Sequence, residues 1–154
     1  EIMKLNVPQF FAEVEVNDFE EYLDNETEIY LVAEVGDELV GAGGLNFVDQ
    51  NKTAMISWDF IKPKWHGKGI GRQLLNHRIE ILKSKETVDI IVVRTSQLAY
   101  EFYEKNGFVL REIHRDYWAP GYDLYKMIYG NGRYRSWVEN AQGDSENLIS
   151  TKND

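Results

Sequence analysis

A glycine-rich, basic segment holds the residues of this sequence that could most directly do chemistry. Glycine occupies every second position at Gly67, Gly69 and Gly71, just before an apolar-periodic run. A helix start presents unpaired N–H groups and a partial positive charge, and glycine lets a bulky phosphate approach the backbone. Four cationic side chains surround this point: Lys62, Lys64, Lys68 and Arg72. The segment predicts a pyrophosphate-binding helix start, the alternative being a tight turn with a solvated basic face.

Two common nucleotide-binding motifs do not account for this segment. A P-loop needs the spacing Gly-x-x-x-x-Gly-Lys-Ser/Thr, which the sequence lacks. A dinucleotide-binding fingerprint needs Gly-x-Gly-x-x-Gly near the first strand of the chain. Here the spacing is Gly-x-Gly-x-Gly, and several predicted strands precede it.

The segment and a second motif resemble the GNAT family of N-acetyltransferases. The family's acetyl-CoA motif is Gln/Arg-x-x-Gly-x-Gly/Ala, and residues 66–71 follow it with His66 in the Gln/Arg position. Downstream the family shows Asn-x-x-Ala-x-x-x-Tyr-x-x-x-Gly-Phe, and residues 96–108 follow that pattern with Ser96 in place of Asn. The resemblance covers residues 29–129, and two motifs at the right separation are more specific than either alone.

The resemblance implies an enzyme that moves an acetyl group from acetyl-CoA directly to an amine, without an acyl-enzyme. The acceptor would be a small-molecule amine or a protein amine. A backbone N–H on the strand before the glycines would polarise the thioester carbonyl, as in an oxyanion hole. Cofactor binding is expected at Phe60, Ile61, His66, Gly67, Lys68, Gly69, Ile70, Gly71, Arg72 and Ser96. The alternative is a non-catalytic acyl-CoA-binding module.

Two side chains are the expected catalytic groups. Tyr103 occupies the family's tyrosine position, where a protonated phenol can protonate the leaving CoA thiolate; alternatively it only packs in the core. Asp59 could deprotonate the amine directly or through water, or it could be solvated or hydrogen-bonded within the sheet. Strand alternation places Asp59 on one face with Met55 and Ser57. Glu34 is a further candidate base.

The acceptor is expected to approach between the first helices and the last hairpin. Acidic and aromatic side chains concentrate in both regions, and they would suit a cationic amine. Trp118 and Tyr122 are the predicted substrate-binding residues. A solvated helix face is the alternative explanation for the acidic residues.

The order of predicted elements supplies the framework for these residues. Residues 1–28 look helical with a break at Pro8, and the helix after the break is expected to be capped by Asn17 and Asp18. Strands are predicted at 29–35, 38–48 and 53–61 as an antiparallel meander. A helix follows the glycines, then a buried central strand at 88–93, a helix at 97–106, and strands at 108–114 and 122–130.

The order of elements indicates the fold class α/β (α+β), a single domain with a mixed, mostly antiparallel twisted sheet and flanking helices. The resemblance implies that this domain is GNAT-like, with strands splayed at the acetyl-CoA site. The domain is expected over residues 1–130, with a polar C-terminal tail at 131–154. Family members usually begin with a strand before the first helix. No such strand is found here, so it is either missing or upstream.

Composition excludes several classes of protein. The 154 residues include no cysteine, which removes disulfides and thiolate chemistry, and the three scattered histidines suggest no metal site. The net charge of −9 argues against nucleic-acid binding. No apolar run is long enough to span a membrane. We expect a cytoplasmic protein, and the final strands could pair two copies into a homodimer.

Overall fold

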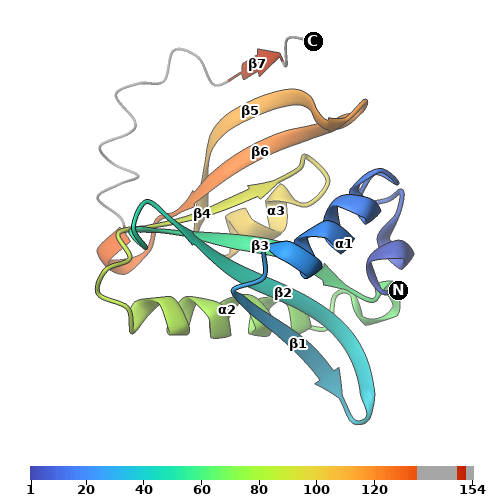
Figure 1. Cartoon of the computed structure of the whole chain (residues 1–154), viewed down its shortest axis with the longest axis horizontal. Coiled ribbons are helices and arrows are strands. Elements are labelled where there is room, and N and C mark those ends of the chain that lie inside the picture. The colour runs from blue at the N-terminus through green and yellow to red at the C-terminus, as the bar shows by residue number, and fades with distance from the viewer. Residues whose placement is uncertain (135–148, 152–154) are drawn as a thin grey trace.

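A mixed sheet forms the centre of the computed structural model, which describes residues 1–134 and 149–151 (Figure 1). Within these residues seven strands lie in the order β1-β2-β3-β4-β6-β5-β7. The strands are β1 (Ile29–Val35), β2 (Glu38–Val48), β3 (Thr53–Ile61), β4 (Ile90–Thr95), β5 (Phe108–Ala119), β6 (Tyr122–Tyr129) and β7 (Ile149–Thr151). The helices are α1 (Glu15–Asn25), α2 (Ile70–Lys83) and α3 (Tyr100–Lys105), with short 3-10 turns η1 (Met3–Asn6), η2 (Pro63–Trp65) and η3 (Gly132–Tyr134).

The predicted antiparallel meander is confirmed, because β1 pairs with β2 and β2 with β3 in antiparallel register. A turn at Gly36, with φ of 59°, joins the first two strands. The predicted central strand is also confirmed, since β4 lies parallel to β3 and antiparallel to β6. Its side chains are buried on both faces, with Ile91 in the core beneath α2 and Val92 in a second cluster on the other face.

Helices cover both faces of the sheet. The apolar stripe of α2, formed by Leu75, Ile79 and Leu82, packs into the main core. On the opposite face, Phe19 of α1 packs against Trp58 and Phe60 of β3. Figure 1 shows α2 running along one side of the sheet and α1 near the far end of β3.

The two central parallel strands separate over part of their length. Pairing between β3 and β4 covers Thr53–Ile56 and Ile90–Val93 and then stops. Beyond that point β3 continues to Ile61 beside β2, and Arg94 and Thr95 of β4 pair with β6 alone. The predicted splaying of the strands is therefore present.

A β-bulge interrupts β3 at the same place and corrects the predicted alternation. Trp58 has φ of 47°, and the register with β2 shifts between Ala42 and Gly44. A bulge adds one residue to one strand, so the side chains after it change faces. Ser57 and Trp58 both lie on the α1 face, and Asp59 lies on the α2 face rather than with Ser57.

The N-terminal region differs from the predicted helix caps. The helix begins at Glu15, before Asn17, and no side chain caps it. No strand precedes α1 in the described part of the chain, so the sheet starts with β1. None of the helices in that part is long and apolar enough to cross a membrane.

The predicted tail lies largely outside the described residues, which omit 135–148 and 152–154. Where it is described, Tyr134 in η3 is 1% exposed and its ring packs against Tyr129. The packed domain therefore extends to Tyr134. Residues 149–151 form β7, parallel to β5.

Candidate active site

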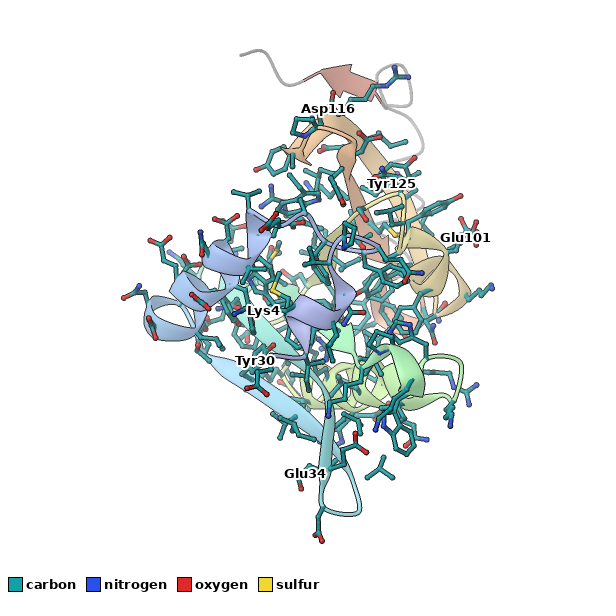
Figure 2. All side chains as sticks on the ribbon, turned by 90° about the vertical axis from the view of Figure 1, so that its right-hand side faces the viewer. Lys4, Tyr30, Glu34, Glu101, Asp116 and Tyr125 are labelled. Atoms are coloured by element: carbon teal, nitrogen blue, oxygen red, sulfur yellow. The ribbon has the colours of Figure 1, made fainter. Side chains whose placement is uncertain are left out.

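A cleft of about 1120 Å³ opens where β3 and β4 separate. Its walls come from the N-terminal segment, the start of α1, the end of β3, the glycine segment, β4 and α3. Figure 2 views the molecule from the side where the N-terminal segment, marked by Lys4, lies between α1 and α3, which carries Glu101. The cleft thus brings together segments that are far apart in the sequence.

The glycine segment forms one end of the cleft. Gly67 and Gly69 have φ of 74° and 81°, a left-handed conformation that favours glycine. A Cβ added at either position would meet no atom within 4 Å, so both open onto free space. Gly69 directly precedes α2, and Ile70, Gly71 and Arg72 of its first turn line this end of the cleft. The geometry suits an anion approaching the helix start.

The four cations of this segment have different surroundings. Lys62 and Lys64 pair with Glu38 at 3.1 and 2.7 Å, and Lys64 and then Lys62 lower the pKa of Glu38 to about 2. The ammonium of Lys68 lies 4.9 Å from the centre of the Trp65 ring. Arg72 lines the cleft and forms no ion pair with the described residues. Among these four cations, Arg72 is the one that lines the cleft.

A buried chain of three polar side chains joins β3, α2 and α3. The Tyr103 hydroxyl donates a hydrogen bond of 2.6 Å to Oδ2 of Asp59, and Oδ1 of Asp59 pairs with Nη2 of Arg78. The Arg78 side chain is fully buried and also donates to the carbonyl oxygens of Gly44 and Leu74. The bulge in β3 makes this possible, because it turns Asp59 toward the α2 face.

The surroundings of Tyr103 keep its hydroxyl protonated. Burial, followed by the charge and hydrogen bond of Asp59, raises the pKa of Tyr103 well above its usual value. Phe102 and Phe108 pack against the ring edge to face. The packed ring therefore presents a protonated phenol on the wall of the cleft.

The end of β3 is held by the N-terminal segment and by His66. Asn6 donates from Nδ2 to the Ile61 carbonyl at 3.0 Å, and Nε2 of His66 lies 2.8 Å from the same oxygen. Phe60 and Ile61 both line the cleft. The Ile61 carbonyl is already engaged, so hydrogen bonds to a ligand would come from other backbone groups of this segment.

The remaining predicted residues lie at different distances from the cleft. Ser96 lines it, and its Oγ accepts the backbone N–H of Leu98 at 3.2 Å. Trp118 also lines it and donates from its ring nitrogen to the Thr95 carbonyl at 3.1 Å. Tyr122 is absent from the lining; its hydroxyl donates to the Pro8 carbonyl at 2.7 Å and ties the last hairpin to the N-terminal segment.

Sequence reasoning missed two charged residues of the site. Arg78 occupies the apolar stripe of α2, between Leu75 and Ile79, and a charge in such a stripe signals a buried partner. Glu15 is buried at the start of α1 and lines the cleft. Nothing in the local sequence distinguishes Glu15 from its acidic neighbours.

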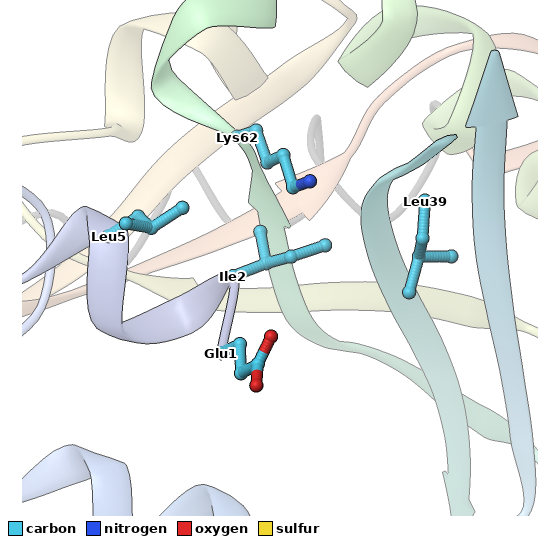
Figure 3. Close-up of a pocket in the computed structure, with 5 residues that line it drawn as sticks. All are labelled: Glu1, Ile2, Leu5, Leu39 and Lys62. Carbon is cyan, nitrogen blue, oxygen red and sulfur yellow. The ribbon is translucent and has the colours of Figure 1, made fainter. Parts of the chain in front are cut away.

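A second, smaller hollow of about 480 Å³ lies between the N-terminal turn and β2 (Figure 3). Its lining residues are Glu1, Ile2, Leu5, Leu39 and Lys62. Lys62 is already paired with Glu38, and the rest of the lining is mainly apolar. This hollow offers no acid–base arrangement comparable to that of the cleft.

Comparison with known proteins identifies the family. The sequence profile of the acetyltransferase (GNAT) family matches residues 1–108. The chain therefore belongs to the GNAT acetyltransferase family. It is 30% identical over 91 residues to an uncharacterised N-acetyltransferase of Methanocaldococcus jannaschii. That alignment covers 54% of this chain and 40% of the relative, so the chain matches less than half of the relative's length.

Solved structures share the fold. An aminoglycoside 6'-N-acetyltransferase complexed with coenzyme A superposes with a TM-score of 0.66 at 18% identity, covering 82% of this chain and 85% of the other. The ribosomal-protein-S18-alanine N-acetyltransferase of Escherichia coli gives 0.60 at 22% identity, covering 71% and 74%. At these identities the likeness concerns the fold, and it confirms the predicted GNAT-like architecture.

Proposed function

We propose that this chain transfers an acetyl group from acetyl-CoA directly to the amine of a small molecule or a protein. The observation that carries the proposal is the cleft, which has an anion-binding helix start at one end and a protonated tyrosine on its wall. Acetyl-CoA, when bound, supplies an acetyl group activated as a thioester. The N–H groups at the start of α2 and the guanidinium of Arg72 would bind its phosphates.

The other predicted cofactor residues would shape the same end of the cleft. Gly67 and Gly69 leave room for the phosphates, whereas a Cβ at Gly71 would contact Phe102 and Ile61. Lys68 is outside the cleft lining, with its ammonium near the Trp65 ring. Ile70 and Ser96 line the passage toward the strands. Backbone N–H groups near Phe60 and Ile61 would polarise the thioester carbonyl. His66 fixes that segment through the Ile61 carbonyl.

Tyr103 would supply the proton to the leaving CoA sulfur, and Asp59 would position it. The Tyr103 hydroxyl rotates about its C–O bond, so it can turn its proton from Asp59 to the leaving sulfur. Asp59 then orients the phenol. Direct removal of the amine proton by Asp59, as the sequence suggested, would place a proton on a carboxylate that already accepts from Tyr103 and pairs with Arg78.

The acceptor would enter on the α1 side of the cleft. Trp118 would contact it, and Tyr122 would hold the last hairpin beside the N-terminal segment. A cytoplasmic location and a homodimer also belong to the proposal; cell fractionation and sedimentation test them.

The experiment is thiol release with acetyl-CoA and a panel of alkylamines, polyamines, aminoglycosides and peptides with free amines. Amine-dependent release of CoA, together with acetylated product, would support the proposal. Binding of acetyl-CoA without release for any amine would instead support the non-catalytic acyl-CoA-binding module. Absence of acetyl-CoA binding would contradict both.

A further inference from the structure

Glu15 is a buried carboxylate that the proposed mechanism does not use. It is the first residue of α1, it is 5% exposed, and it nevertheless lines the cleft. Its Oε2 accepts the backbone N–H of Ala12 at 2.7 Å. This bond ties the side chain to the turn that precedes α1 and fixes it at the helix start.

Among the residues that the structure describes, no cation pairs with this carboxylate. Glu15 forms no ion pair in the described part of the chain, and the nearby charge that acts on it is Asp18 on the same helix. Burial and, to a lesser extent, Asp18 raise the pKa of Glu15 to about 7, against the lowering effect of the Ala12 hydrogen bond. The other charged groups that line the cleft include His66, Asp59 and Arg94. A base that titrates near neutral pH is the most effective kind.

The position of Glu15 complements that of Tyr103. Phe11 and Trp58, whose rings stack at 6.3 Å, lie on the α1 face and line the same cleft as Glu15. Tyr103 belongs to the core beneath α2, on the opposite face. An amine entering from the α1 side would meet aromatic faces and a carboxylate before it reached the gap between the strands.

We propose that Glu15 accepts the proton of the substrate ammonium, and that the substrate is a primary amine on an apolar chain that packs against Phe11 and Trp58. This inference rests on the proposed function. Glu15 takes one proton from the ammonium and later releases it to solvent. The nitrogen–carbon bond then forms and the carbon–sulfur bond breaks. The sulfur takes the Tyr103 proton, and the second amine proton returns to Tyr103 through water.

The test is the pH dependence of kcat/KM for heptylamine at saturating acetyl-CoA. The wild-type rate should rise through an apparent pKa near 7. Glu15→Gln keeps the size of the side chain and the hydrogen bond from Ala12. Its kcat/KM should no longer rise through this pKa and should be roughly 10²–10⁴-fold lower than that of the wild type. Glu13→Gln, an exposed neighbour, is the matched control and should match the wild type.

The substrate class is tested with 2-(2-methoxyethoxy)ethylamine, a polar chain of nearly equal length. With both values expressed for the ammonium form that Glu15 deprotonates, heptylamine should have the higher kcat/KM. Equal values would overturn the apolar-chain part of the inference.

The outcomes separate this inference from the proposed function. If the wild type is active and Glu15→Gln is equally active and keeps the rise of the rate with pH, the role of Glu15 is overturned. The proposed function is not affected by that result. A wild type that acetylates no amine overturns the proposed function. If Glu15→Gln does not fold, carboxyl NMR of the wild type decides. A midpoint near 7 that changes when heptylamine binds supports the role, and a midpoint near 4.5 or no response to the amine contradicts it.

Discussion

At the scale of single residues, the buried pair of Asp59 and Arg78 leads to the most specific prediction about stability. Arg78 is fully buried, and a Cβ at Gly43 would collide with the carboxylate, so the pair fits only because glycine lies opposite it. Arg78→Met should lower the free energy of unfolding by about 3–5 kcal/mol, because it leaves Asp59 without its cation. Urea denaturation measures this loss.

The coupling between the two residues is tested by a double-mutant cycle. Adding Asp59→Asn to Arg78→Met should cost less than the sum of the single substitutions, because no unpaired charge then remains. Strict additivity would mean that the two side chains do not stabilise one another.

Tyr103→Phe removes one oxygen and keeps the ring packing against Phe102 and Phe108. The chemical step should slow by roughly 10²–10⁴-fold if the phenol protonates the sulfur, while affinity for CoA stays the same. Single-turnover rates measure the effect. Tyr100→Phe, on the same helix but outside the cleft lining, should be neutral. An unchanged rate in Tyr103→Phe would reduce Tyr103 to a packing residue.

Local motifs made some of these residues predictable from sequence and left others hidden. Tyr103 and the glycines lie in motifs with fixed spacing. Arg78 and Glu15 do not, because the consequence of burying a charge depends on partners that only the tertiary fold supplies. Asp59 was predicted as a site residue, but its contact with Arg78 requires the bulge at Trp58, which strand alternation does not reveal.

At the scale of elements, the start of α2 should bind the cofactor through its backbone. Gly69→Ala should lose most of the thermal shift caused by acetyl-CoA, because its Cβ would occupy the open space before the helix. The control is Gly36→Ala in the β1–β2 turn, which also has positive φ and open space around it. Both variants should lose similar intrinsic stability, roughly 1–2 kcal/mol, because a side chain is disfavoured at positive φ. If Gly69→Ala kept the full thermal shift, phosphate binding at the start of α2 would be contradicted.

The start of α1 should make stability depend on pH. The pKa of Glu15 is raised from 4.5 to about 7, so the folded state holds this proton more tightly than the unfolded state. The resulting stabilisation is complete below pH 4.5 and is lost as pH rises to about 7. Allowing for water in the cleft, the loss should be about 2 kcal/mol.

Glu15→Gln should remove this pH-dependent part of the free energy of unfolding. Urea denaturation at pH 4.5 and pH 8 measures it, with Glu13→Gln as the control. The stability difference between the two pH values should be smaller in Glu15→Gln by that amount. Equal pH dependence in both variants would place the Glu15 pKa at its ordinary value.

The elements themselves were largely predictable. The first three strands have the predicted limits, because turn residues separate them and Pro63 follows the third. The strand predicted at 108–114 instead continues to Ala119, and Trp118 therefore lies in β5 rather than in a loop. Its hydrogen bond to Thr95 is a contact between distant segments that a local pattern does not contain.

At the scale of the whole molecule, the cleft depends on contacts between the two ends of the domain. Tyr122 bonds to Pro8 and Asn6 bonds to Ile61, so the N-terminal segment holds both the last hairpin and the end of β3. Sequence predicts the strands and the family resemblance predicts their splaying. The closing of the cleft by residues at the N-terminus arises from packing and was not predictable from either.

The most direct test of the account is single-turnover acetyl transfer with the wild type, labelled acetyl-CoA and the best amine acceptor, followed by mass spectrometry. The account predicts one acetylated amine for each CoA released, with no acetyl group on the protein at any time. An acetylated protein intermediate that forms and decays at the turnover rate, or CoA release that does not depend on the amine, would contradict direct transfer.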